Sequence, residues 1–330
     1  MLAFKVTLLP MLIGASAMIV GLWYKGIDRK LAARMQSRVG PPIRQPFIDV
    51  KKLFLKENLV PNTSVPWLFH LAPFLGLVAT VTTLLYLPIG DFEPVLAGYG
   101  DLILILYLLA LPALAMVIGG FASGAPYAVV GAQREMVMMM SYELPLAATV
   151  VTLAWKLDKI LGGGATVFSM GTIFANPLWS QVGPIGVIGL LVLLFVMLIV
   201  TPIELSKIPF DVAEAETEIA EGLLSEYSGR NLALFYLTDA VKTVAMASLI
   251  VGLFFPYQIG FVLGLTGTIG ILVNTLFFLL KLFLVILFSV TMVRVAAARF
   301  KITQVAYLFW VPLTLTSLLG LGLIVLDSIV

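Results

Sequence analysis

The chain alternates between long apolar stretches and shorter polar connections, and this alternation predicts its elements. Eight stretches approach or exceed the ~20 residues that a helix needs to cross the hydrocarbon core of a bilayer. The predicted spans cover roughly residues 7–24, 67–88, 101–122, 136–156, 184–203, 232–254, 269–295 and 304–327. We therefore expect an all-α integral membrane protein with eight transmembrane helices, forming a single polytopic domain over residues 1–330.

Two connections carry patterns of their own. The first, residues 25–66, is long and polar. Within it Ile48, Leu53 and Phe54 recur among charged residues, which predicts an amphipathic helix lying on the membrane surface. Residues 258–267 contain three glycines, which predict a short turn or half-helix before the seventh span.

Composition excludes several classes of protein. The 330 residues are 61% hydrophobic and only 12% charged, against about 25% charged in soluble domains. A net charge of +2 gives no reason to expect a nucleic-acid partner. The chain has no cysteine, which excludes thiolate-ligated iron–sulfur clusters, and its one histidine, His70, cannot form a histidine-based metal site. We expect no cofactor bound by this chain and any redox centre in a partner subunit.

The distribution of the 20 lysines and arginines predicts the topology. The first connection holds nine of them, and the other odd-numbered connections hold six more, including Arg134. The opposite side has three. The positive-inside rule then makes the odd connections cytoplasmic and puts both termini outside the cell membrane. For Arg134 and its neighbour Glu135 two interpretations stay open: ionisable groups of the fourth span with a function, or ordinary residues at the membrane interface.

The fifth connection, residues 204–231, is acidic where the cytoplasmic side normally favours positive charge. Glu214, Glu218 and Glu221 have the spacing i, i+4, i+7, which predicts one face of a helix. Two interpretations stay open. The carboxylates form a solvated face, or they form a partly buried stack whose raised pKa values allow proton uptake and release.

Ionisable residues inside the predicted spans are a second sign of function, because each costs at least ~2.5–3.5 kcal/mol at the bilayer centre unless it is paired or hydrated. Glu143 and Lys281 have no evident partner on their own helices, so we expect both to face the protein interior. Asp239 and Lys242 are three residues apart and within reach of each other, as a functional pair or a structural ion pair.

The first connection also predicts a docking surface. Glycine and proline at positions 40–42, with Gln45-Pro46, specify a fixed turn rather than a loose basic tether. A rigid basic platform suits a peripheral subunit, although basic residues at a membrane surface also orient the chain and bind anionic lipid head groups. The candidate docking residues are Arg34, Arg38, Arg44, Gln45, Asp49 and Lys52.

Three motifs in order along the chain resemble one known family. They are Arg38-Val39-Gly40-Pro41 with Gln45-Pro46, Asp49 and Lys52; Ser141-Tyr142-Glu143; and Pro209-Phe210-Asp211 with Glu214, Glu216 and Glu218, followed by Glu226-Tyr227-Ser228. Together they are similar to the H-type membrane subunit of respiratory complex I, the proton-pumping NADH:quinone oxidoreductase, and to its relatives in membrane-bound NiFe hydrogenases.

Departures from the family pattern favour the hydrogenase branch. Only Pro42, Ile43 and Arg44 separate the Gly-Pro and Gln-Pro elements, where quinone-reducing members carry extra residues. The element before Pro-Phe-Asp reads Glu204-Leu205-Ser206-Lys207, and the C-terminal element reads Lys301-Ile302-Thr303-Gln304, without the family's aspartate.

The resemblance implies a membrane anchor and coupling subunit of a ferredoxin-linked, energy-converting oxidoreductase that drives H⁺ or Na⁺ translocation. Its implied partners are peripheral hydrogenase- or dehydrogenase-like and iron–sulfur subunits, which would carry the iron–sulfur and NiFe centres, antiporter-like membrane subunits, and lipid. The expected coupling groups are Glu143, Asp211, Glu214, Glu216, Glu218, Glu221 and Asp239, with Lys242 and Lys281 as intramembrane basic residues. The alternatives are a quinone-chamber subunit of a complex I-type dehydrogenase and a stand-alone ion transporter.

Overall fold

The computed structural model describes residues 8–96, 98–162, 167–265 and 267–329. Within these residues eight helical segments are long and apolar enough to cross a membrane, which confirms the predicted number. Six of them are the helices α1 (Leu9–Met35), α3 (Pro66–Leu85), α4 (Leu102–Ser123), α5 (Pro126–Leu161), α7 (Pro184–Glu204) and α9 (Gly229–Phe254). The short elements between them are α2 (Gln45–Leu55), α6 (Met170–Ala175), α8 (Glu216–Ile219), α10 (Ile259–Val262) and the 3₁₀ turns η2 (Leu178–Ser180), η3 (Val212–Glu214) and η4 (Gly222–Leu224).

The last two spans each contain one π-helical turn. The seventh consists of α11 (Gly267–Ile286), η5 (Leu287–Thr291) and α12 (Met292–Ala296). The eighth consists of α13 (Ile302–Leu308), η6 (Phe309–Leu313) and α14 (Thr314–Ile329), with Pro312 inside its π turn. Such turns insert one residue into a helix and are frequent at functional sites.

The sequence sets many of the helix ends. Pro126 and Pro184 stand at the first position of α5 and α7, where a missing backbone N–H is harmless. Gly124 follows α4 with a left-handed φ of +68°, a conformation that glycine adopts without strain. At the other end of α4, the carboxylate of Asp101 accepts a hydrogen bond from the Leu104 N–H at 2.9 Å.

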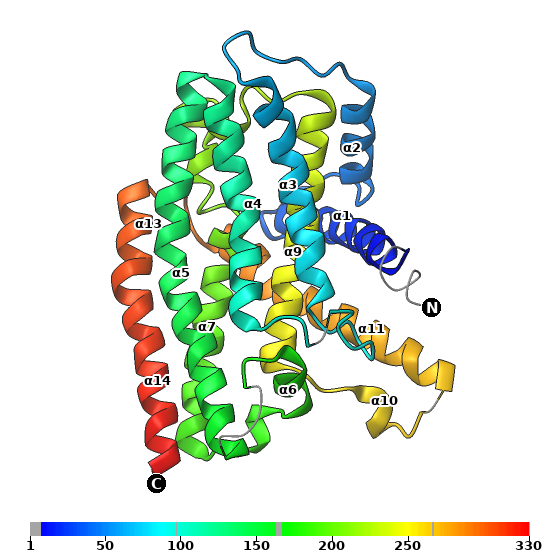
Figure 1. Cartoon of the computed structure of the whole chain (residues 1–330), viewed down its shortest axis with the longest axis vertical. Coiled ribbons are helices and arrows are strands. Elements are labelled where there is room, and N and C mark those ends of the chain that lie inside the picture. Colours follow the sequence, from blue (N-terminus) through cyan, green and yellow to red (C-terminus); the bar gives the residue numbers. More distant parts are fainter. Residues whose placement is uncertain (1–7, 97, 163–166, 266, 330) are drawn as a thin grey trace.

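Helix α9 is the centre of the bundle. In its most apolar stretch of 18 residues 83% of the residues are buried, a larger share than in any other of the eight spans. It packs against α1, α2, α3 and α11, and α1 crosses it obliquely at mid-height in Figure 1. On the other side of the molecule α5, α7 and α14 pack together. Polar residues on α9 therefore face protein rather than lipid.

The odd-numbered connections lie in the upper half of the view in Figure 1, and those beside the ends of α4, α5 and α9 lie at its top. There the Val65 N–H donates to the Ala122 carbonyl at 2.8 Å, and Arg299 forms an ion pair with Asp211 at 2.6 Å. This arrangement is the one that the charge distribution requires. The assignment of this end to the cytoplasm stays a prediction.

Two predicted boundaries are wrong. Helix α1 continues through residues 25–35, which the pattern assigned to the first connection, and α5 begins ten residues before the predicted position 136. In both places a helix continues through charged residues, which lower the local hydropathy without ending the helix. Arg134 and Glu135 accordingly lie within α5 rather than in a connection. The predicted helix in the first connection and the half-helix at 259–262 are confirmed.

The crossing of α1 over α9 depends on a glycine. A Cβ at Gly21 would collide with the carbonyl oxygen of Ala240. We expect Gly21→Ala to destabilise the folded chain by about 1–3 kcal/mol, because helix backbones in contact cannot yield locally. Gly322→Ala is the matched control, since a Cβ there meets no atom within 4 Å, and it should be neutral or slightly stabilising. Thermal unfolding of the two variants in the same detergent measures the difference.

Candidate functional site

A cavity of about 230 Å³ lies between α1, α7, α9 and the connection that follows α7. Half of the residues that line it are ionisable, although most of them lie in or beside membrane-length helices. These are Lys25, Asp28, Arg29, Glu204, Lys207, Asp211, Glu214, Asp239, Lys242 and Arg294, with Tyr236 beside them. Charged groups at such depth mark a functional site by default, because each must be paired or hydrated to be tolerated.

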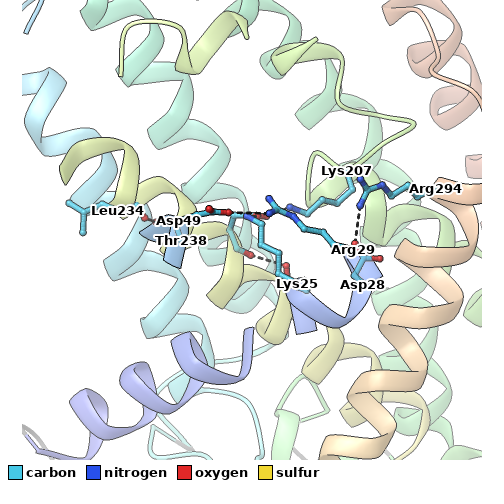
Figure 2. A network of polar contacts seen from close by, with 10 residues as sticks. Lys25, Asp28, Arg29, Asp49, Lys207, Leu234, Thr238 and Arg294 are labelled. Carbon is cyan, nitrogen blue, oxygen red and sulfur yellow. Dashed lines mark hydrogen bonds and ion pairs between the residues drawn. The ribbon is translucent and has the colours of Figure 1, made fainter. Parts of the chain in front are cut away.

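Asp239 holds two lysines at once. Its carboxylate accepts hydrogen bonds from Lys25 Nζ at 2.8 Å and from Lys207 Nζ at 2.5 and 2.6 Å. Figure 2 shows the surroundings of this pairing, where Lys25 comes from α1 and Lys207 comes from the connection after α7. Three elements therefore meet at one carboxylate, and the cluster carries one excess positive charge.

Lys242, one turn further along α9, has a different partner. Its ammonium group lies 2.8 Å from Oε1 of Glu204 and donates to the Glu204 carbonyl oxygen at 2.6 Å. Glu204 is 1% exposed and ends α7, so the ammonium also meets the negative end of that helix. The predicted ion pair between Asp239 and Lys242 is wrong, because each side chain reaches a neighbouring element instead of its own helix.

Glu135 and Tyr142 extend the polar interior along α5. Glu135 is 1% exposed, so its side chain is enclosed by protein rather than solvated at the surface. One of its carboxyl oxygens accepts a hydrogen bond from Ser206 at 3.4 Å. Within the described part of the chain, its other oxygen and the Tyr142 hydroxyl have no hydrogen-bond partner. Burying polar atoms without partners is unfavourable, and their presence suggests a role beyond packing.

The acidic connection is not one helix. It consists of η3, α8 and η4, and the left-handed φ angles of Ala220 and Glu221, +49° and +67°, separate the last two. The prediction that Glu214, Glu218 and Glu221 share a helix face is therefore wrong. The segment folds back over α5, where Arg134 donates to the Val212 carbonyl at 3.2 Å and pairs with Glu218 at 2.5 Å.

This folding separates the acidic residues into two groups. Asp211 and the partly buried Glu214 line the cavity, whereas Glu216, Glu218 and Glu221 are exposed. Burial raises the pKa of Glu214 to about 7, although the nearby Lys207 opposes this rise. Burial also raises the pKa of Asp211, against the effect of Arg299. The solvated face is thus confirmed for Glu216, Glu218 and Glu221, and the partial burial is confirmed for Asp211 and Glu214. Proton uptake and release stay a prediction.

Glu143 does not occupy the position expected for it, whereas Lys281 is turned toward the protein as expected. Glu143 is exposed on the side of α5, so the prediction that it faces the interior of this chain is wrong. Lys281 is partly buried and donates to the carbonyl oxygens of Phe255 and Tyr257 at 2.9 and 2.8 Å, just after the end of α9. A cation near unpaired carbonyls at a helix C-terminus stabilises that end, which is a structural role.

The six predicted docking residues also form two groups. Four are exposed, namely Arg34, Arg38, Arg44 and Lys52. The other two hold α2 in place: Gln45 donates to Asp49 at 2.8 Å, and Asp49 accepts from Arg29 of α1 at 3.3 Å. Docking of a subunit on the exposed group stays a prediction.

Several residues of the site were not predicted from the sequence. Asp28 accepts hydrogen bonds from Thr291 in the π turn at 2.7 Å and from Arg294 at 3.1 Å. A signal existed for some of them, since Lys25 and Asp28 follow the first apolar run directly and Glu204 ends another. Partners from other parts of the chain, such as Lys207 for Asp239, left no signal near the residue that they pair with.

The comparisons with known proteins extend over nearly the whole chain. The family model described as NADH dehydrogenase matches residues 7–325. Hydrogenase-4 component C of Escherichia coli (strain K12) is 35% identical over 299 residues, 89% of each chain. Formate hydrogenlyase subunit 4 of the same strain is 32% identical over 232 residues, 70% of this chain and 72% of that one.

A solved structure shares the fold. It is the membrane-bound sulfane sulfur reductase, an archaeal respiratory membrane complex, which matches with a TM-score of 0.81 and 29% identity over 96% of this chain and 98% of its counterpart. Eight membrane-length helices around a charged cavity, together with these relatives, define a membrane anchor subunit of an energy-converting oxidoreductase complex. The chain belongs to the NADH dehydrogenase family, as a relative of the H-type membrane subunit of complex I, which confirms the resemblance seen in the sequence.

Proposed function

We propose that this protein couples redox events in a peripheral subunit to ion movement in neighbouring membrane subunits, through the charged groups of its cavity. The single observation that carries the proposal is the linked set of ionisable residues from the connection after α7 into the centre of the bundle. Asp211 and Glu214 stand at its outer end, and Asp239 and Lys242 lie on α9 within the same cavity.

Glu214 is the group best suited to exchange protons. A pKa near 7 makes both of its protonation states accessible under physiological conditions. A shift of charge in a subunit docked over this end would change its proton affinity. The two lysines around Asp239 would respond in turn, because both also lie near Glu214. This supports Glu214 and Asp239 as coupling groups, with Asp211 held by Arg299 at the entrance.

Glu143 supports a membrane partner on the side of α5. A carboxylate on a membrane-length helix and exposed at the surface of the isolated chain would be costly against lipid. The exposed Met140 and Leu144 on either side of it are apolar. We place an antiporter-like membrane subunit against this face, with Glu143 as the group through which the two subunits interact.

The relatives suggest which reaction drives the complex. Two of them are named as components of hydrogenase systems. We therefore place a hydrogenase-type subunit with iron–sulfur and NiFe centres over the exposed Arg34, Arg38 and Arg44, with ferredoxin as the electron donor. The exposed Glu216, Glu218 and Glu221 offer acidic contacts at the same end. This arrangement requires the odd connections to be cytoplasmic and both termini to be outside.

The charge in the cavity disfavours a quinone as the acceptor. A quinone head group is neutral, whereas ten ionisable side chains line the 230 Å³ of space. Charged groups already paired with one another would have to lose those partners to accept it. Inhibition of the complex by quinone analogues would favour the quinone-chamber alternative.

The proposal is tested by Glu143→Gln in the assembled complex. We expect the number of H⁺ or Na⁺ ions moved per electron to fall at least several-fold while electron transfer continues, because the change removes charge without changing shape. Glu226→Gln is the matched control, since Glu226 is an equally exposed carboxylate in a connection rather than on a membrane-length helix. Undiminished pumping by a fully assembled Glu143→Gln complex would refute the coupling role of this residue.

A titration tests Glu214 directly. We expect an infrared carboxylic-acid band that disappears with a midpoint near pH 7 and is absent from Glu214→Gln. The direction of this pKa shift also predicts how stability depends on pH. Because folding raises the pKa of Glu214, its ionisation destabilises the folded protein as the pH rises from about 4.5 to above 7. Glu214→Gln should therefore stabilise the protein at pH 8 and not at pH 4. A band with a midpoint near pH 4.5 would show that the site is open to solvent.

A further inference from the structure

A second pocket lies between α1, α2 and α9, and it shares Lys25, Arg29 and Tyr236 with the cavity described above. Its volume is about 220 Å³, room equivalent to about seven water molecules. Its walls are largely apolar and come from all three helices: Leu22, Pro46, Val50, Leu53 and Leu232. We call it the α2 groove. A space of this size accepts a polar head group but not the whole of a lipid.

The rim of the α2 groove is basic. Four cations line it, Lys25, Arg29, Lys52 and Lys56, against the single carboxylate of Asp49. In the described part of the chain the groove includes two ion pairs, Lys25 with Asp239 and Arg29 with Asp49, and neither involves Lys52 or Lys56. These two lysines are exposed and four residues apart, so they lie on one face of α2. The groove therefore has unneutralised positive charge at its opening.

The end of α2 carries apolar side chains that the described part of the chain leaves largely exposed. Phe54 is 46% exposed, Leu55 is 79% exposed, and Leu59 just beyond the helix is 64% exposed. Apolar groups beside lysines, on a helix that packs along membrane spans, are typical of a segment at the boundary between lipid head groups and acyl chains. Lysine side chains reach from such a position toward phosphate groups.

We propose that the α2 groove binds the phosphodiester head group of an anionic phospholipid. Lys52 and Lys56 contact the phosphate at the opening, the free donors of Arg29 face it from α1, and the acyl chains lie outside the pocket along Phe54 and Leu55. This assigns Lys52 to lipid and leaves Arg34, Arg38 and Arg44 for a docked subunit. The proposal is independent of ion coupling, since it requires only that the chain lies in a membrane.

Binding of defined lipids to the purified, delipidated complex tests the proposal, with native mass spectrometry as the readout. Phosphatidylglycerol and phosphatidylcholine with the same acyl chains are compared. We expect the complex to retain phosphatidylglycerol preferentially. Lys52→Gln/Lys56→Gln should weaken its binding roughly 25-fold, about 5-fold for each lysine near an anionic group. Lys30→Gln/Lys51→Gln is the control, because it removes the same charge from two lysines of the same region that do not line the groove.

Other outcomes would overturn the assignment. Equal retention of the two lipids, or equal phosphatidylglycerol binding by the two double variants, would show that the groove is not an anionic-lipid site. Displacement of the lipid by millimolar inorganic phosphate would identify a free-anion site instead, and preferential retention of a neutral isoprenoid quinone would identify a quinone site. A measurement on the unaltered complex avoids variants that fail to assemble. Raising the salt concentration from about 0.05 to 0.5 M should weaken phosphatidylglycerol binding, because salt screens the attraction between the lysines and the phosphate. Binding that does not depend on salt would contradict the proposal.

Discussion

Replacing Lys242 with methionine is expected to destabilise the folded chain by about 3–5 kcal/mol. The substitution leaves the Glu204 carboxylate, which is 1% exposed, without its only ion-pair partner in the described residues. A buried charge whose partner is removed loses the attraction and keeps the full desolvation penalty. The change also removes the hydrogen bond to the carbonyl oxygen that ends α7. Thermal or denaturant unfolding of the chain in detergent measures the loss.

A double variant separates charge from packing in this prediction. Lys242→Met/Glu204→Met removes both charges and keeps apolar volume, so we expect it to recover most of the stability lost in Lys242→Met. If Lys242→Met is as stable as the unaltered chain, Glu204 is not ionised in the folded protein and the pair described above is a hydrogen bond between neutral groups. The double variant should still fail to couple ion movement, because the charged groups are gone.

Replacing Asp239 with asparagine has the second largest expected effect. It removes the carboxylate that the ammonium groups of Lys25 and Lys207 both contact, so the two cations lose their shared ion-pair partner. All three side chains retain some contact with solvent, with side-chain exposures of 17–26%. Water therefore relieves part of the repulsion, and we expect a loss of about 2–4 kcal/mol. Coupled ion movement should fall at least tenfold in any complex that still assembles.

The excess positive charge of the cluster formed by Lys25, Lys207 and Asp239 allows a control for this prediction. Lys207→Gln leaves a neutral Lys25–Asp239 pair and should have little effect on stability. Added to Asp239→Asn, the same change should restore stability, because only one lysine then remains. If Asp239→Asn/Lys207→Gln is less stable than Asp239→Asn alone, repulsion between the lysines is not the cause of the loss.

A structural ion pair elsewhere tests whether lost stability alone explains lost coupling. Lys156 on α5 and Asp327 on α14 form a buried pair at 3.0 Å, and Asp327 also accepts from the backbone N–H groups of Gly183 and Gly186 at the start of α7. Asp327→Asn should destabilise the chain comparably to Asp239→Asn. Complexes that survive assembly should still move ions normally, because this pair lies outside the cavity.

The sequence by itself determined the class of structure and the family. Apolar runs long enough to cross a bilayer exclude other folds, and the number of spans follows from their count. Prolines and glycines set helix ends by backbone geometry alone, as at Pro126 and Gly124. The family motifs could be recognised because the residues of each motif lie close together in the sequence. The family model, which matches residues 7–325, and the relatives confirmed the family that the motifs indicated.

Tertiary structure alone decided which charged groups form the site. Helical spacing brought Asp239 and Lys242 together on α9, yet their partners Lys207 and Glu204 come from elsewhere in the chain. The same spacing aligned Glu214 with Glu218, but left-handed residues and packing on α5 put one in the cavity and the other at the surface. Sequence periodicity describes the faces of one helix. The burial and pairing of an ionisable group depend on which other element packs against that face, and that is a property of the folded bundle.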